Sequence, residues 1–562
     1  MHDLVIRDAT IVDGTGAPRR TGDVAVDAGR ITSVGEADER GRREVDAGGL
    51  VLTPGWVDIH THYDGQVTWD PDVTPSSWHG VTTVVMGNCG VGFAPVRPGR
   101  EDFLIELMEG VEDIPGTALH EGIDWQWESF ADYLDALDRV PRVLDIAAQV
   151  PHAAVRAYVL GERAHDDATA DEIEAMARLV QEALEAGAVG FTTSRTILHR
   201  SRHGLVPGTA APADELLAIG DALAGAGHGV FEVVADQPDG EAQRTWMVEL
   251  ARRTGATLTY ALAQVPYAPT GYRDALADAD QLAAGGLHVV PQVSCRPTGM
   301  LFGLQSSLHP FITHPTYRSL ADLPLGERVR RLREPDVRAQ LLEERPATEN
   351  TIAIALISRW DQIFPLGDPP DYEPAPETSA AAAAEREGRT PEAVVLDWLL
   401  ERGGEALLFA PLASYVDKNH DALREMMTHR RTVLGLSDGG AHCGLICDAS
   451  MPTYLLTHWA RDRVRGERLP LEQAVHLQTG RTAAVYGLTD RGTVEPGKRA
   501  DLNLVDLEAL RLHAPEMVFD LPAGGRRLVQ RVDGYRATFV AGEATIEDGE
   551  LTGARPGRLV RA

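Results

Sequence analysis

Short apolar segments separated by turn residues occupy both ends of the chain. Near the N-terminus they lie at residues 4–6, 9–12, 23–26 and 30–35, and the same pattern returns at residues 501–505 and 537–543. Short apolar runs bounded by turn residues, such as Asp13 and Gly14, are typical of an antiparallel β module. We therefore predict one small β domain, a β-sandwich, assembled from residues 1–54 and 484–562.

Between these ends, strand-like apolar runs alternate with helical segments. The predicted strands lie at residues 56–60, 82–86, 143–149, 187–192, 229–234, 257–262, 288–293 and 433–436. Helices with an apolar stripe near period 3.6 are predicted at 171–186, 213–226 and 241–254. Strands that alternate with helices indicate a parallel sheet covered by helices, and eight such strands suggest that the sheet closes into a barrel. The predicted fold class is α/β, a (β/α)8 TIM-like barrel over residues 55–483.

The gap between the last two predicted strands is too long for a single crossover. It contains a segment rich in arginine and glutamate at residues 326–344 and a run of alanines at residues 380–384. We predict a helical insertion over residues 296–430. The alanine run fits either a helix or a disordered segment.

Composition and charge narrow the class of protein. The 562 residues carry a formal net charge of -31 at pH 7. No basic run could follow a phosphate backbone, so no nucleic acid is expected as a partner. We find no apolar stretch of membrane-spanning length and no export signal, and four cysteines are too few for a disulfide framework. We expect a cytoplasmic protein without a membrane partner; formation of a homo-oligomer is left open.

Candidate metal chemistry begins at the end of the first predicted strand, in His60-Thr61-His62. Side chains two residues apart lie on one face of a strand, so both imidazoles can reach one cation. The spacing alone also fits two strand-end histidines without a ligand. Cys89 follows the second predicted strand and Asp438 follows the eighth. Active sites of such barrels gather at the carboxyl ends of the strands, and we expect these residues to meet there.

Several motifs together resemble the amidohydrolase superfamily, and within it the D-aminoacylase branch, which deacylates N-acyl-D-amino acids. They are PGWVDIHTH at residues 54–62, GNCG at 87–90, MEGVEDIP at 108–115, GAVGFT at 187–192, SDG at 437–439 and DRGTVEPGKRADL at 490–502. The motifs stand in the family's order and extend almost from end to end. The resemblance is weakest in the insertion before the eighth strand.

The resemblance implies a metal-dependent hydrolase of a non-peptide C–N bond, with a small-molecule substrate and zinc, one or two divalent ions, as cofactor. It places His60 and His62 at the metal centre, Cys89 as its thiolate ligand, and Asp438 as the general base and acid. A carboxylated lysine on strand four is a common alternative in the superfamily. Neither Lys418 nor Lys498 stands at that position.

The chain departs from the family at strands five and six, where the family supplies one histidine each. In an ungapped reading, Glu232 and Tyr260 stand in their places. A carboxylate inside an apolar strand needs a cation or donors, so Glu232 is either an oxygen ligand or a structural partner of an arginine. Tyr260 is a poorer ligand because a phenol ionises only near a pKa of about 10. We assign it a substrate-binding or supporting role.

Three further residues are predicted to contact the substrate: His152 after strand three, Arg195 in a basic loop after strand four, and His442 close to Asp438. An arginine in that loop could hold a substrate carboxylate through two hydrogen bonds, although the loop could equally be a solvated surface segment.

Two other functions stay open. One is hydrolysis of a cyclic amide, lactam or lactone; the other is a metal-depleted barrel that acts as a binding protein or a metal-independent catalyst.

Overall fold

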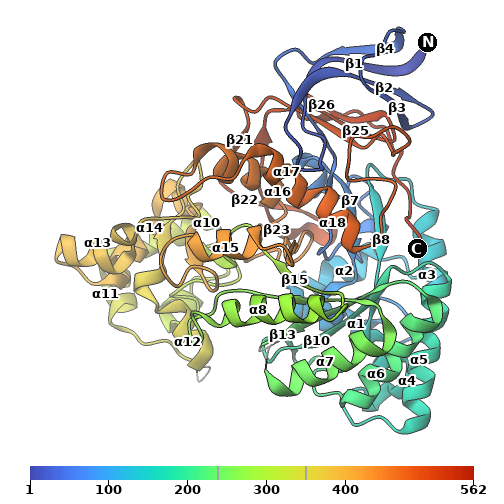
Figure 1. Ribbon diagram of the computed structural model, residues 1–562. Helices are drawn as coiled ribbons and strands as arrows, with labels where there is room; N and C mark the ends of the chain where they lie inside the picture. The colour runs from blue at the N-terminus through green and yellow to red at the C-terminus, as the bar shows by residue number, and fades with distance from the viewer. Residues whose placement is uncertain (237–239, 349–350) are drawn as a thin grey trace.

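The computed structural model describes residues 1–236, 240–348 and 351–562 (Figure 1). Strands from both ends of the chain form one sheet of nine strands, in the order β27-β26-β25-β20-β5-β1-β2-β3 with β4 paired to β1. Their bounds are His2–Ile11 (β1), Arg20–Asp27 (β2), Arg30–Gly35 (β3), Gly41–Asp46 (β4), Val51–Pro54 (β5), Leu502–Val505 (β20), Tyr535–Val540 (β25), Glu543–Glu547 (β26) and Glu550–Leu551 (β27). The two ends therefore share one sheet.

The join between the two ends lies where β20 inserts beside β5. Leu504 pairs with Leu52 in an antiparallel register, and both side chains are buried with Ile6 and Phe539 in one apolar cluster. Burial of these side chains from distant parts of the chain supplies the free energy that holds the termini together. The β-sandwich form and the domain boundaries stay predictions.

All the central strands pair in parallel, as the alternating pattern predicts. One sheet holds Trp56–Asp58 (β6), Val81–Met86 (β7) and Asp145–Ala148 (β8); the other holds Val150–Pro151 (β9), Gly190–Arg195 (β10), Val230–Ala235 (β13), Thr257–Ala261 (β14), Val289–Val293 (β15) and Val433–Leu434 (β19). Each of the eight predicted strands overlaps one of these. Only Gln149 separates β8 from β9, and the amide of His62 donates to Gly439 O at 2.7 Å after β19. The two sheets therefore approach each other at two places: β8 lies next to β9, and the chain after β6 is bonded to the chain after β19.

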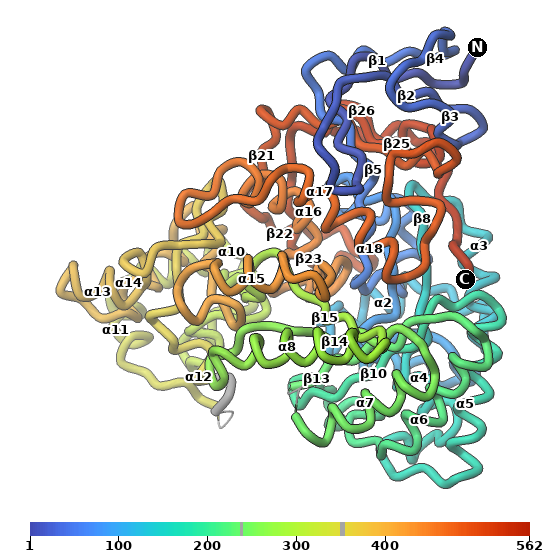
Figure 2. Tube along the Cα trace, in the orientation of Figure 1, coloured from blue at the N-terminus to red at the C-terminus, as the bar shows by residue number. Residues whose placement is uncertain are grey.

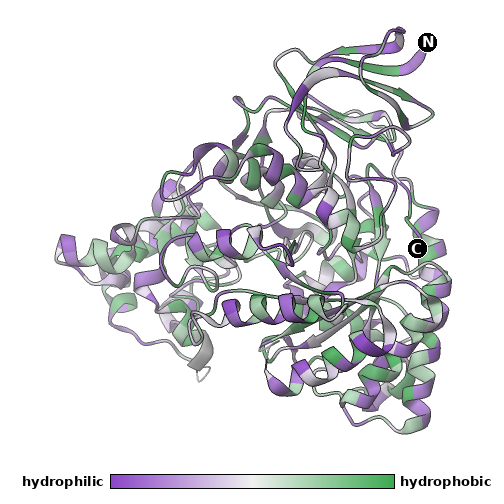
Figure 3. Cartoon of the chain, in the orientation of Figure 1, coloured by the Kyte–Doolittle hydropathy of each residue, from purple (hydrophilic) through white to green (hydrophobic). Residues whose placement is uncertain are grey.

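Helices follow most of these strands and cover them. The three predicted helices are Ala170–Glu185 (α5), Ala213–Ala226 (α6) and Glu241–Thr254 (α7), followed by Gly271–Ala284 (α8). Helix α5 begins at a capping box in which Thr169 and Glu172 satisfy each other's backbone amides. Apolar and polar segments alternate along α6, α7 and α8, as Figure 3 shows. Each helix therefore buries one stripe against the strands and exposes the other.

Other helices complete this part of the chain. They are Glu101–Glu112 (α1), Gly116–Gly122 (α2), Phe130–Asp138 (α3), His152–Leu160 (α4), Met451–Tyr454 (α16), Leu471–Gln478 (α17) and Gly480–Val485 (α18), with a π-helix at Leu455–Asp462. Within the described residues, no helix combines the length and the apolar character needed to cross a membrane.

The predicted insertion projects from the strands as a largely helical unit (Figure 1). Its helices are Pro315–Arg318 (α9), Leu325–Leu332 (α10), Pro335–Glu343 (α11), Thr351–Ile357 (α12), Ala380–Glu387 (α13), Pro391–Leu399 (α14) and Asp421–Thr428 (α15). The insertion also contains a small sheet of Gly299–Phe302 (β16), Phe364–Pro365 (β17) and Leu408–Pro411 (β18), which the sequence pattern did not predict. It has its own apolar core, which includes Phe302, Leu332 and Leu396. The alanine run is helical, and Ser379 caps it.

The C-terminal segment does not stay within the nine-stranded sheet. A hairpin of Glu516–Leu521 (β22) and Gly525–Val529 (β23) leaves it, and Leu528 N donates to Cys443 O at 2.6 Å. The final residues run beside β8 (Figure 2), where Arg558 O accepts the amide of Ile146 at 3.0 Å. The C-terminal part of the chain thus contacts both the loop after β19 and strand β8.

Candidate metal centre

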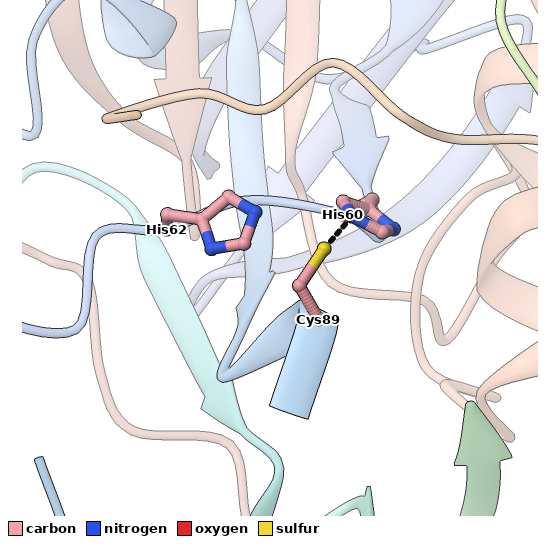
Figure 4. A group of neighbouring side chains, drawn as sticks. All are labelled: His60, His62 and Cys89. Atoms are coloured by element: carbon pink, nitrogen blue, oxygen red, sulfur yellow. Dashed lines mark hydrogen bonds between the residues drawn. The ribbon is translucent and has the colours of Figure 1, made fainter. Parts of the chain in front are cut away.

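His60, His62 and Cys89 converge at the carboxyl ends of β6 and β7 (Figure 4). One ligand atom from each lies within 4.8 Å of the others, and Cys89 Sγ lies 3.4 Å from His60 Nε2. All three side chains are buried. The predicted strand-end histidines and the thiol are therefore brought together in one group, which we call the histidine–cysteine group.

Backbone conformations around the group are unusual. Cys89, Asp438 and His442 all have positive φ angles, of 58°, 49° and 51°. Such left-handed conformations cost free energy in residues other than glycine, and they concentrate at functional sites, where the surrounding structure enforces them. Gly90 permits the close turn, because a Cβ there would lie 2.7 Å from Ser194 N. The short apolar strand thus ends in a loop that aims Cys89 inward.

Asp438 reaches the group from the other side, after β19. Its Oδ1 lies 3.4 Å from His60 Nε2 and 3.8 Å from His62 Nε2. Burial would raise the pKa of this carboxyl, but the nearby ring of His62 and the charges of His60 and His442 outweigh burial and hold the pKa below its usual range. Asp438 is therefore ionised at neutral pH and can accept a proton.

Glu232 lies on β13 and faces the same group. Its side chain is 1% exposed; Oε2 accepts the amide of Cys89 at 3.3 Å, and Oε1 lies 3.7 Å from His60 Nδ1. Burial raises the pKa of Glu232 to about 7. Among the described residues, no arginine forms a salt bridge with it, so the arginine-paired alternative has no support in the structure. A carboxylate oxygen at this position can serve a cation.

The unpaired atoms around the group fit a bound cation. Both ring nitrogens of His62 and Oε1 of Glu232 are buried without a hydrogen-bond partner within the described residues. A buried polar atom without a partner costs free energy, which a bound ion recovers. His60 is already oriented, because its Nδ1 contacts Gln292 Oε1 at 3.0 Å and leaves Nε2 facing the thiol. Imidazole, thiolate and carboxylate donors together suit zinc.

Of the predicted substrate contacts, only His442 lies at the group. Its Nε2 is 3.9 Å from Asp438 Oδ2, and the side chain is 22% exposed. His152 uses both ring nitrogens elsewhere, towards Thr193 and Glu215. The guanidinium of Arg195 donates to the backbone oxygens of Gly208 and Ala211. The structure does not bring His152 or Arg195 to the group, and their substrate contacts stay predictions.

Tyr260 points away from the group. Its neighbour Thr259 accepts a hydrogen bond from Gln292 at 3.1 Å, on the face of β14 that looks towards His60. Because side chains alternate along a strand, Tyr260 lies on the opposite face, where helix α7 packs. Thr259 therefore faces the site on β14, and the alternation of side chains does not support a substrate contact for Tyr260.

Two residues at the site, Glu112 and His199, were assigned no role from the sequence. Glu112 ends helix α1 and lies 3.6 Å from His62 Nδ1. His199 Nδ1 forms a hydrogen bond with Ser194 Oγ at 3.0 Å, and burial, followed by the charges of His442 and His62, lowers the pKa of His199 to about 3. The motif at residues 108–115 contains Glu112 and was a signal. The strand pattern alone gave no role to Glu112, because this residue belongs to a helix and not to a strand end.

A second cluster that could hold a metal ion consists of Glu373, His420 and His458. Here Arg463 donates to both carboxylate oxygens of Glu373, at 3.1 Å and 3.0 Å. The guanidinium already neutralises the carboxylate, which makes this cluster a buried ion-pair network and a poor cation site.

The fold and the site together define an α/β protein with a group of residues at its strand ends that could hold a metal ion. Residues 43–546 match the Amidohydrolase family, and the chain belongs to this family. The predicted resemblance is confirmed by its relatives. A D-aminoacylase of Alcaligenes xylosoxydans xylosoxydans is 28% identical over 99% of this chain and 97% of that protein. An N-acyl-D-aspartate deacylase of the same organism is 30% identical, over 99% of this chain and 95% of its own.

Solved structures agree with this relationship. An N-acyl-D-glutamate deacylase from Bordetella bronchiseptica, complexed with zinc and a phosphonate inhibitor, is 25% identical with a TM-score of 0.65, and the match covers 100% of both chains. A crystal structure of D-aminoacylase has a TM-score of 0.66 at 24% identity, also over 100% of both chains, which is a likeness of fold.

Proposed function

We propose that this protein is a zinc-dependent amidohydrolase that deacylates an N-acyl-D-amino acid or a related amide. Its two parallel sheets would form one closed (β/α)8 barrel, with the site at the carboxyl end. Family membership and relatives that deacylate N-acyl-D-amino acids support this activity. The single observation that carries it is the convergence of His60, His62 and Cys89 within 4.8 Å around unpaired buried donor atoms.

His60, His62 and Cys89 would hold the ion, with Glu232 as an oxygen ligand. When bound, zinc polarises the carbonyl of the amide and lowers the pKa of a water molecule. The protein's own groups do the rest. Gln292 fixes the orientation of His60 through its 3.0 Å contact with Nδ1, and burial of the group excludes bulk water.

Asp438 would move the proton. Ionised and 3.4 Å from His60 Nε2, its carboxylate accepts a proton from the attacking water and then delivers it to the departing nitrogen. This transfer completes cleavage of the C–N bond into a carboxylic acid and a free amine. His442, which is partly exposed beside Asp438, would contact the substrate or a second ion. A location in the cytoplasm and a homo-oligomer stay predictions.

The test combines metal content with a panel of substrates. Purified full-length protein should contain at least one zinc per chain, should hydrolyse N-acetyl-D-amino acids faster than their L-isomers, and should lose this activity on chelation. Preference for lactams or lactones over N-acyl amino acids would favour the alternative hydrolase. Activity that survives removal of all metal would refute the proposal.

A further inference from the structure

His199 is a histidine at the site to which the mechanism above gives no role. It follows strand β10 in a loop that continues into a hairpin of Arg200–Ser201 (β11) and Gly204–Leu205 (β12). The residue is half-buried, and its Nδ1 bonds to Ser194 Oγ at 3.0 Å. The contact with Ser194 determines both the position and the protonation of this imidazole.

Ser194 places the imidazole close to the histidine–cysteine group. Side chains two residues apart share one face of a strand, so Ser194 and Thr192 point in the same direction. Thr192 Oγ1 accepts the amide of Gly90 at 3.0 Å, and Thr192 pairs with Glu232 on β13. This face therefore looks towards the group, and Ser194 lies two residues, or about 6.6 Å, further towards the carboxyl end of the strand. His199 thus lies at the mouth of the site.

The hydrogen bond with Ser194 also decides which ring nitrogen of His199 carries a proton. The side chain of Ser194 is buried, and its hydroxyl has no other hydrogen-bond partner within the described residues. A buried hydroxyl needs an acceptor, so Ser194 Oγ donates its proton to Nδ1. Burial, followed by the charge of His442, lowers the pKa of His199 to about 3 and keeps the ring neutral. The proton of the ring is therefore on Nε2, which has no partner in the described part of the chain.

The chain is anchored on both sides of His199. The amide of Ile197 donates to the carboxylate of Asp236, after β13, at 2.8 Å. On the other side, the ring of His203 bonds to Glu106 on helix α1. These contacts tie the loop to two elements that each carry a residue of the site. The imidazole is therefore held in position before a substrate binds.

Asp438 and His199 approach the site from different strands and have opposite hydrogen-bonding capacity. Three strands, β13, β14 and β15, separate β10 from β19 in the sheet. The ionised carboxylate of Asp438 can only accept a proton, whereas the neutral ring of His199 offers an N–H. When water adds to the carbonyl carbon of an amide, negative charge develops on the carbonyl oxygen, and a fixed donor that faces this oxygen lowers the barrier.

We propose that His199 is a further catalytic residue, whose Nε2–H donates a hydrogen bond to the carbonyl oxygen of the scissile amide. His199 keeps its proton throughout the reaction. The proton of the attacking water still passes to Asp438 and then to the departing nitrogen. This inference rests on the proposed function, because it takes an N-acyl amino acid or a related amide as the substrate.

The test compares His199→Ala with wild-type full-length protein on the N-acetyl-D-amino acid that wild type hydrolyses fastest. We expect kcat to fall about 100-fold, KM to change by less than about threefold, and the zinc content to stay at the wild-type value. His199→Gln keeps an N–H donor on a side chain of similar reach, and it should recover at least about fivefold of the lost kcat.

A phosphonate analogue of the same substrate separates a catalytic role from a structural one. Its tetrahedral phosphorus carries the negative oxygen that the carbonyl acquires as water adds, so its inhibition constant should rise about 100-fold in His199→Ala. The inhibition constant of the product, the free D-amino acid, should change by less than about threefold.

His203→Asn is the matched control, because His203 is an exposed histidine of the same hairpin that bonds to Glu106. Its kcat should stay within about twofold of wild type. A His199→Ala variant that loses its zinc, that changes only KM, or that binds the phosphonate as tightly as wild type does overturns this inference and leaves the proposed function intact. Wild-type protein that hydrolyses no N-acyl amino acid overturns the proposed function itself.

Discussion

Asp438 and His60 are joined twice, once through the backbone and once through their side chains. The amide of Asp438 donates to His60 O at 3.1 Å, and Asp438 Oδ1 lies 3.4 Å from His60 Nε2. The first contact pairs the chain after β19 with the chain after β6. The contact between the side chains therefore depends on the backbone bond, because that bond sets the position of the carboxylate relative to the imidazole.

Replacement of Asp438 by asparagine should abolish most of the activity. The amide has almost the same shape and keeps the backbone bond to His60, but it cannot accept the proton of the attacking water. We expect kcat to fall by about 10²–10⁴-fold, with the bound zinc retained. Steady-state kinetics and metal analysis of the same preparation check this. A variant with more than a tenth of the wild-type rate would exclude Asp438 as the proton carrier.

Cys89→Ala should remove zinc, whereas Cys295→Ala should not. Both cysteines are buried, so the two substitutions cost similar packing energy. Only Cys89 has its sulfur near an imidazole, 3.4 Å from His60 Nε2; the sulfur of Cys295 bonds to Met451 O. Zinc affinity, measured by competition with a chelator, should fall at least about 100-fold in the first variant alone. Equal zinc affinity in both variants would disprove the thiolate assignment.

Glu232→Gln should weaken metal binding without unfolding the protein. The amide is isosteric and can still accept the amide of Cys89, but it removes the charge 3.7 Å from His60 Nδ1. We expect a zinc affinity about 10–100-fold lower.

The contrasting variant is Glu215→Gln, which breaks a buried pair with Arg156. It should lower the free energy of unfolding by about 3–5 kcal/mol and leave zinc affinity unchanged. Denaturant titrations measure the free energies of unfolding, and chelator competition measures the zinc affinities. If Glu215→Gln weakens zinc binding and Glu232→Gln does not, the assignment of Glu232 as a ligand is wrong.

Glu373 should make stability depend on pH. Burial would raise the pKa of its carboxyl, but hydrogen bonds from His458 and Arg463 outweigh it and hold the pKa well below the usual range. Because the folded pKa is the lower one, the stabilisation is complete above the unfolded pKa of about 4.3 and is lost as the pH falls through the folded value. The advantage of wild type over Glu373→Gln in unfolding free energy should therefore shrink steadily below about pH 5.

The exposed Glu377 supplies the control for this measurement. Glu377→Gln should change the free energy of unfolding by less than about 0.5 kcal/mol at every pH. An advantage of wild type over Glu373→Gln that stays constant between pH 7 and pH 3 would show that the carboxylate does not stabilise the fold through its charge.

The sequence by itself determined the strands and the residues at their ends. Strand β7 and the thiol that follows it could be predicted because apolar runs and the turn at Gly87 are local features. The alternation of side chains along a strand also predicted that His60 and His62 lie on one face. The structure brings both of them to the same group as Cys89. The buried carboxylate of Glu232 was also visible, since an acidic residue inside an apolar strand needs a partner.

Only the tertiary structure decided which side chains meet across the site. Thr259, and not Tyr260, faces inward because the pairing of β14 with its neighbours sets which face of the strand is inside, and a shift of one residue reverses every side chain. Glu112 reaches His62 because the end of helix α1 is bonded to the loop of His442. The bond between His442 and Glu112 joins segments hundreds of residues apart, and no local periodicity in the chain records it.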